Sequence, residues 1–198
     1  MTAKKPTSEE AAQRIAKAIM DSISKVPSTL EPPSALPKER ARMLASTAAL
    51  QASALAGTLA LPPGPAGLLT ILPELFGVWR IQAQMVADIA GAFDKAGTLS
   101  REQMLYCLFK HSAAQAVRDL VLRVGERVMI RHAGVRVIQR VAAAIGVKVT
   151  QRAIAKSVAR WLPVVGAVGV AGYAYYDTAQ VATTAIAFFE REIEVEES

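Results

Sequence analysis

Apolar residues with helical spacing open the chain. Three isoleucines, from Ile15 to Ile23, recur every four residues. This spacing predicts a helix over residues 8–25, capped by Ser8 or the residue before it. Residues 26–37 then carry four prolines. Because proline cannot continue a helix, this segment is predicted to be a linker or an extended strap.

An uncharged stretch follows, from residue 44 to residue 73. It predicts a helix from near Pro37 to about residue 61, stopped by Pro62 and Pro63, with the prolines forming the corner of a helical hairpin. Its uncharged part only just approaches the roughly 20 residues of a membrane span. Serine, threonine and glutamine alternate with alanine there, which favours a tightly packed helix pair over a span.

The next helix is predicted from Pro73, in its first turn, to Lys95, with Gly97 closing it. One face is apolar and the opposite strip is polar, so the helix is amphipathic. The apolar face carries Leu75, Val78, Trp79, Gln82, Val86, Ile89 and Phe93, and the polar strip carries Arg80, Gln84 and Asp88. Each charged residue would cost about 2.5 to 3.5 kcal/mol at the centre of a span, which opposes a membrane-spanning helix here.

Ser100 and Gln103 form a capping-box pattern that starts another helix at Arg101. Beyond Gly125 the chain is rich in valine, so a strand is conceivable. Arginines nevertheless recur every four residues from 123 to 131, and this spacing favours helix.

Residues 134–145 and 146–157 share the pattern G-V-[RK]-V-x-Q-R. Two interpretations stay open: chance similarity of two short basic helical units, or two phosphate-contacting units side by side.

The last apolar run, from residue 161 to 189, has glycine at 166, 169 and 172. This spacing clears one side of a helix for another backbone. The acidic end of the chain is expected to be solvated or frayed.

These elements predict an all-α fold, a compact bundle of about six helices with a central apolar helical hairpin. The expected division is an N-terminal helix with its proline-rich strap at 1–37, a helical domain at 38–190, and an acidic tail at 191–198. Apolar residues make up 52% of the chain without glycine, whereas ordinary soluble domains reach about 45–50% with it. The surplus favours close helix packing or affinity for membranes.

Charge is unevenly distributed. Residues 101–160 contain 12 basic and 3 acidic side chains, a net charge of +9 in a chain whose total is +6. An anionic membrane attracts such a segment by about 1 kcal/mol per Lys or Arg near the headgroups. Nucleic acid is a less favoured partner, because no aromatic residues alternate with the basic residues and no nucleic-acid recognition motif is found in this segment. The lipid-binding candidates lie within the basic segment 118–160 and beside it: Arg131, Arg136, Arg140, Lys148, Arg152, Lys156, Arg160 and Trp161.

Signals for chemistry are sparse. Cys107 is the only cysteine, and His111 lies four residues after it, so the two side chains can meet on a helix, away from its leucine face. Neither an orienting group nor an oxyanion site accompanies them, and no metal-ligand spacing, nucleotide loop or nucleophile elbow is present. We therefore expect no catalytic residues, metal or cofactor. The buried-polar or ligand-binding candidates are Glu74, Arg80, Asp88 and Asp177, with an acid–arginine ion pair as the favoured interpretation.

Three segments together resemble the EcsC-like family of bacterial proteins: LPPGPAGLLTILPEL, VWRIQAQMVADIAG and WLPVVGAVGVAGYAYYDTAQVA. The resemblance covers roughly residues 40–190, and members of the family share a late P-x-x-G-A-x-x-G segment. It implies an α-helical, membrane-associated bacterial protein without an established chemistry. Family members often place an acidic residue before the proline of the middle helix, whereas here Pro73 precedes Glu74.

The expected function is non-enzymatic: a membrane-associated or lipid-binding protein on the cytoplasmic side, peripheral to or partly inserted in the inner membrane. Charged residues among the first 17 argue against a signal peptide. The predicted partners are an anionic membrane lipid or acyl chain, a second copy of the chain, or a membrane protein. The alternatives are a soluble oligomeric adaptor or scaffold and, less favoured, an enzyme using Cys107 and His111.

Overall fold

A computed structural model describes residues 8–23, 26–59, 67–124, 127–131, 133–157, 163–191 and 195–196. The described part of the chain forms six α-helices, and the all-α prediction is confirmed. They are α1 (Ser8–Ile23), α2 (Pro37–Leu59), α3 (Gly67–Ala92), α4 (Arg101–Val117), α5 (Val135–Ser157) and α6 (Pro163–Glu190). Short 3-10 turns, η1 (Ala96–Thr98) and η2 (Arg118–Leu120), flank α4.

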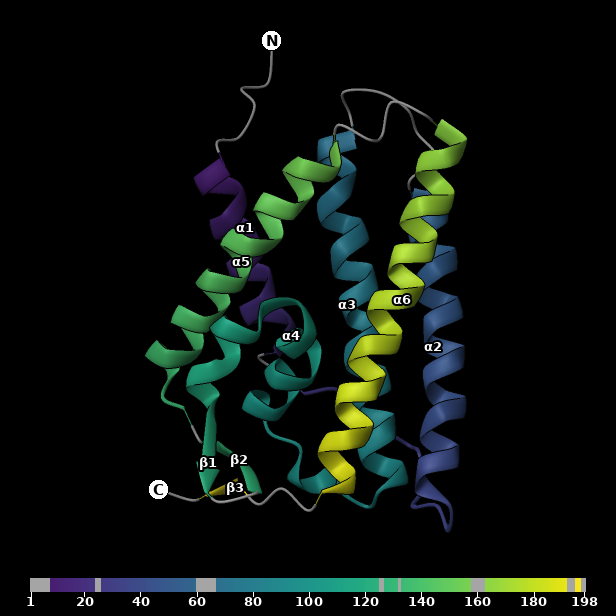
Figure 1. The fold of residues 1–198 in the computed structure, drawn as a ribbon, viewed down its shortest axis with the longest axis vertical. Coiled ribbons are helices and arrows are strands. Elements are labelled where there is room, and N and C mark those ends of the chain that lie inside the picture. The colour runs from purple at the N-terminus through teal and green to yellow at the C-terminus, as the bar shows by residue number, and fades with distance from the viewer. Residues whose placement is uncertain are drawn as a thin grey trace.

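The helices form two groups (Figure 1). In one group α2 packs against both α3 and α6, and in the other α1 packs along α5. Helix α4 contacts α6 and α5 and so joins the two groups. The predicted hairpin is present as α2 and α3, and its proline corner lies outside the described residues.

Helix α4 supplies much of the core. Its capping box is formed as predicted. The Ser100 hydroxyl accepts from the backbone N–H of Gln103 at 3.2 Å, and Oε1 of the Gln103 side chain accepts from the backbone N–H of Ser100 at 2.9 Å. Every residue from 102 to 109 is buried. Ala113, with φ −141° and ψ 45°, kinks the helix just beyond His111.

The proline-rich strap, residues 26–36, forms neither helix nor strand and lies against α3. The backbone amide of Ser34 donates to the carbonyl of Ala92 at 3.0 Å. Thr29 donates to Asp88 at 2.6 Å. A Cβ added to Gly91 would lie 2.6 Å from the Glu31 carbonyl oxygen. Glycine at this position therefore allows the strap to lie directly on α3.

Two predictions of secondary structure were wrong, the start of one helix and the type of one element. Helix α3 begins at Gly67, so Pro73 lies inside it rather than in its first turn. A proline inside a helix removes one backbone hydrogen bond, and the helix continues through it. The valine-rich segment forms β1 (Val121–Val124) and β2 (Arg127–Arg131), an antiparallel pair in which Val121 faces Ile130, rather than a helix.

The valine-rich segment forms strands because β-branched side chains suit the pleated surface of a sheet. The helical spacing of its arginines did not outweigh this preference. The end of the chain adds a third strand, β3 (Val195–Glu196), parallel to β2. These two residues of the acidic tail are therefore paired rather than frayed.

Glycines mark where backbones meet, at positions different from those predicted. A Cβ on Gly146 would lie 2.5 Å from the Ala12 carbonyl oxygen, so α5 approaches the backbone of α1. The same atom on Gly169 or Gly172 would meet nothing within 4 Å. The predicted close contact at these two glycines is absent from the described structure, while Gly166 was not tested by it.

The two repeat units lie almost entirely within the single helix α5. Twelve residues correspond to about three and a third turns, so equivalent positions point about 120° apart. The units therefore do not present matching faces side by side.

Candidate functional site

A polar cluster joins three helices within the bundle. Asp177 of α6 accepts from His111 of α4, with 2.8 Å between carboxylate Oδ1 and imidazole Nε2. Gln82 of α3 donates through Nε2 to the other carboxylate oxygen at 2.9 Å and to the Thr178 hydroxyl at 3.1 Å. Gln82 and Thr178 are 1% and 0% exposed. The cluster therefore ties α3, α4 and α6 together from inside.

The helices position these groups by simple periodicity. Gln82 lies on the otherwise apolar face of α3 that the sequence predicted, between the buried residues Trp79 and Val86. Asp177 and Thr178 lie on the side of α6 that faces α3 and α4. Two sequence signals indicated this cluster: a glutamine on an apolar face, since a buried amide needs hydrogen-bond partners, and Asp177, which was already a buried-polar candidate.

The partner of Asp177 was predicted wrongly. An arginine was expected, and the structure gives His111 and Gln82 instead. Partner choice here is decided by tertiary packing, because His111 and Asp177 are 66 positions apart in the chain.

The electrostatics favour an ionised Asp177. Burial raises the pKa of this carboxyl, but hydrogen bonds from His111 and Gln82, the charge of His111 and a bond from Tyr173 together outweigh burial and hold the pKa below its ordinary value. A carboxylate only accepts hydrogen bonds, so Nε2 of His111 carries a proton. Both side chains are largely buried, at 15% and 16% exposure.

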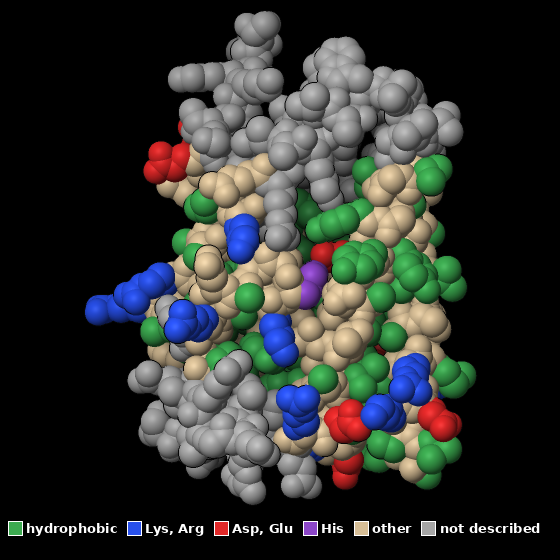
Figure 2. Space-filling view, in the orientation of Figure 1, with side chains coloured by type: hydrophobic (Ala, Val, Ile, Leu, Met, Phe, Trp, Pro, Cys, Tyr) green, Lys and Arg blue, Asp and Glu red, His purple; other side chains and the backbone are tan. Residues whose placement is uncertain are grey.

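Two polar atoms of this cluster have no protein partner among the described residues: His111 Nδ1 and Gln82 Oε1. Histidine and carboxylate atoms lie together near the middle of the face in Figure 2, where the surface is hollowed. Gln82 Oε1 is an acceptor, whereas His111 Nδ1 accepts in the neutral imidazole and donates in the imidazolium. This arrangement suits a bridging water, which can both donate and accept.

Cys107 does not take part in this cluster. It is fully buried, and burial raises the pKa of its thiol far above the ordinary range. The prediction that it lies away from the buried face was wrong, because the whole run from 102 to 109 is buried. A neutral thiol without access to solvent is not a nucleophile.

The other predicted polar candidates are dispersed. Asp88 accepts from Thr29 and from Gln84 at 2.6 and 2.9 Å, so its partners are a strap hydroxyl and a neighbouring amide rather than an arginine. Arg80 is exposed, and no described carboxylate pairs with it. The side chain of Glu74 lies outside the described residues.

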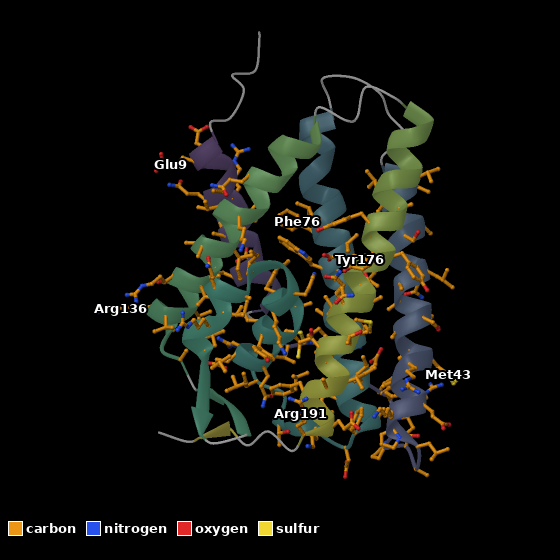
Figure 3. The ribbon with its side chains drawn as sticks, in the orientation of Figure 1. Glu9, Met43, Phe76, Arg136, Tyr176 and Arg191 are labelled. Carbon is orange, nitrogen blue, oxygen red and sulfur yellow. The ribbon has the colours of Figure 1, made fainter. Side chains whose placement is uncertain are left out.

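The described basic side chains of the predicted segment are exposed or partly exposed on α5 and at the end of α4. Arg136 and Arg140 are exposed one turn apart, and Lys148 is partly exposed further along the helix. Among the described side chains none of these three pairs with a carboxylate. Arg118, just after α4, is likewise exposed. We call Arg118, Arg136, Arg140 and Lys148 the basic face. Figure 3 shows Arg136 pointing outward at the edge of the molecule.

The remaining lipid-binding candidates lie outside the description. This holds for the side chains of Arg131, Arg152 and Lys156, and for Arg160 and Trp161 entirely.

Comparisons with protein-family models, with curated proteins and with solved structures give no match for this chain. In the part of the chain that the structure describes, no helix combines the length and the apolar character of a membrane span. Nor do three or more His, Cys, Asp or Glu side chains in that part gather as a metal site.

Proposed function

We propose that this protein associates peripherally with anionic membrane surfaces through its basic face, without catalysing a reaction. The observation that carries the proposal is that exposed arginines of α5 have no carboxylate partner in the described structure. Charges that serve stability are usually balanced within the protein, whereas unbalanced and clustered cations raise the local concentration of anionic partners.

The composition of the α5 surface supports a membrane rather than a nucleic acid. Val135 and Val147 are exposed large apolar residues, at 62% and 48%, and each adjoins a basic residue of the same helix, Arg136 or Lys148. At 100° per residue Val147 projects between Arg136 and Arg140, whereas Lys148 projects about 120° away from Arg136. An exposed apolar side chain between two arginines suits a membrane surface, where the apolar group enters the headgroup boundary and the arginines contact phosphates.

A non-enzymatic role agrees with the chemistry of the described residues. Cys107 is buried and its thiol is neutral, and His111 bonds to Asp177 rather than to Cys107. The polar cluster serves this proposal as a structural tie that holds α4 against α3 and α6. Membership of the EcsC-like family and a place on the cytoplasmic side of the inner membrane remain predictions from the sequence.

The proposal predicts salt-sensitive binding to anionic vesicles. Purified protein is expected to sediment with vesicles of equal parts phosphatidylglycerol and phosphatidylcholine, and not with phosphatidylcholine alone. Because salt screens charges over about 8 Å at 0.15 M and about 3 Å at 1 M, the bound fraction should fall steeply as salt rises. Equal recovery on both kinds of vesicle would exclude an electrostatic role for the basic face.

A second function is favoured by the exposed side of α6. Val168 and Tyr176 are 69% and 61% exposed, and the nearby Gly169 and Gly172 face open space. An apolar surface with little steric bulk suits contact with a second copy of the chain, as in an oligomeric adaptor. A defined oligomer in buffer, with no binding to either kind of vesicle, would favour this function over the first.

A further inference from the structure

A groove runs between α2 and α6, away from both the polar cluster and the basic face. Its volume is about 490 Å³, within the range of about 300–1,000 Å³ that is usual for small-molecule sites. The lining residues come from one face of each helix: Lys38, Arg42, Ala45, Ser46, Ala49, Tyr175, Ala179, Ala182, Thr183, Ile186, Ala187 and Glu190.

Small side chains line much of this groove. Alanines line it on both helices, at 45 and 49 on α2 and at 179, 182 and 187 on α6. The two helices also lie close together: a Cβ added to Gly57 would be 3.3 Å from the Cβ of Ala171. The lining of α6 extends over sixteen residues, from Tyr175 to Glu190, which corresponds to about 22 Å along the helix.

The charges of the groove lie at one end. Lys38 pairs with Glu190 at 2.6 Å, and both side chains are about half exposed. Arg42, one turn further along α2, is exposed and has no carboxylate partner among the described residues. Figure 2 shows basic and acidic side chains together over the lower ends of α2 and α6. Two cations against one carboxylate leave this end with a single positive charge, while Tyr175 at the other end is uncharged.

We propose that this groove binds one long-chain fatty acid, with its carboxylate at Arg42 and Lys38 and its acyl chain along the alanines toward Tyr175. One net positive charge complements a monovalent carboxylate head, and the small apolar side chains of both helices leave room along the groove for an unbranched acyl chain. The inference extends the proposed function from a lipid surface to a single lipid, but it uses other residues.

The test is calorimetric titration of the full chain with hexadecanoate below its critical micelle concentration. We expect one molecule bound per chain. Arg42→Glu should weaken binding at least about tenfold, because it reverses the charge that faces the carboxylate. Ser46→Trp should abolish binding by filling the groove from an exposed position. Met43→Trp is the matched control: Met43 is 61% exposed on the same helix but does not line the groove, so its affinity should equal that of the unmodified protein.

Three results would overturn the assignment: no binding of hexadecanoate, unchanged affinity in Ser46→Trp with its helical circular dichroism retained, or preference for soluble dihexanoyl phosphatidylglycerol, a two-chain lipid. Measuring the same variants on anionic vesicles separates the two proposals. Arg42→Glu should retain salt-sensitive vesicle binding if the basic face on α5 is responsible for it. If the unmodified protein binds hexadecanoate but does not bind anionic vesicles, only the proposed function is rejected.

Discussion

Asp177→Ala is expected to lower the free energy of unfolding by about 3 kcal/mol or more, the typical cost of removing one partner from a buried pair. The substitution leaves the Nε2–H of His111 without an acceptor and removes one of the two acceptors of Gln82. It also creates a cavity where three helices meet. Urea denaturation followed by circular dichroism measures the change.

The matched control is Asp88→Ala. Asp88 also accepts two side-chain hydrogen bonds, but at the surface between the strap and α3, so about 1 kcal/mol is expected there. A double-mutant cycle with His111→Ala should give a coupling energy above about 1 kcal/mol between His111 and Asp177. Equal costs for the two alanine variants would contradict the account of the cluster as a tie between helices.

The same pair gives the protein a defined dependence on pH. Because the pKa of Asp177 is lowered in the folded protein, its contribution to stability is present above the unfolded value of about 3.9 and is lost as the pH falls through the folded pKa. The stability of the unmodified protein should therefore decline more steeply than that of Asp177→Ala as the pH falls below about 4.

Removing two arginines of the basic face is expected to have the second large effect. Arg136→Gln/Arg140→Gln should weaken binding to anionic vesicles by about 2 kcal/mol, roughly thirtyfold, at about 1 kcal/mol for each cation near the surface. The comparison is Arg42→Gln/Arg80→Gln, which removes the same charge from exposed positions on α2 and α3. If both pairs reduce binding equally, net charge rather than the basic face determines the affinity.

The features that the sequence predicted well are those decided by neighbouring residues. Ser100 and Gln103 contact each other across one turn, so the start of α4 follows from its capping pattern. The apolar side of α3 follows from periodicity, and the prolines of residues 26–37 account for the strap. The capping box and the apolar face depend on residues only a few positions apart in the chain. In the strap, the prolines prevent the backbone from forming a helix.

The features that it missed depend on contacts between distant segments. The sequence offers several arginines as possible partners of Asp177. The packing of α4 against α6 determines that His111 is the partner. The strands β1 and β2 contain both valines and regularly spaced arginines, and β2 gains a further partner from β3, more than sixty residues later. Gly169 and Gly172 looked like packing positions, but Gly146 and Gly57 meet neighbouring helices instead.

A fluorescent label placed directly on α5 tests the central claim most closely. Gln139 is exposed between Arg136 and Arg140, and Gln51 is exposed on α2. Figure 3 places Arg136 and Met43 of α2 at opposite edges of the molecule. Because Cys107 is fully buried, Gln139→Cys and Gln51→Cys each introduce one accessible thiol for an environment-sensitive dye. On phosphatidylglycerol vesicles the label at 139 should report an apolar, salt-reversible environment while the label at 51 stays unchanged; a response at 51 with none at 139 would contradict the account.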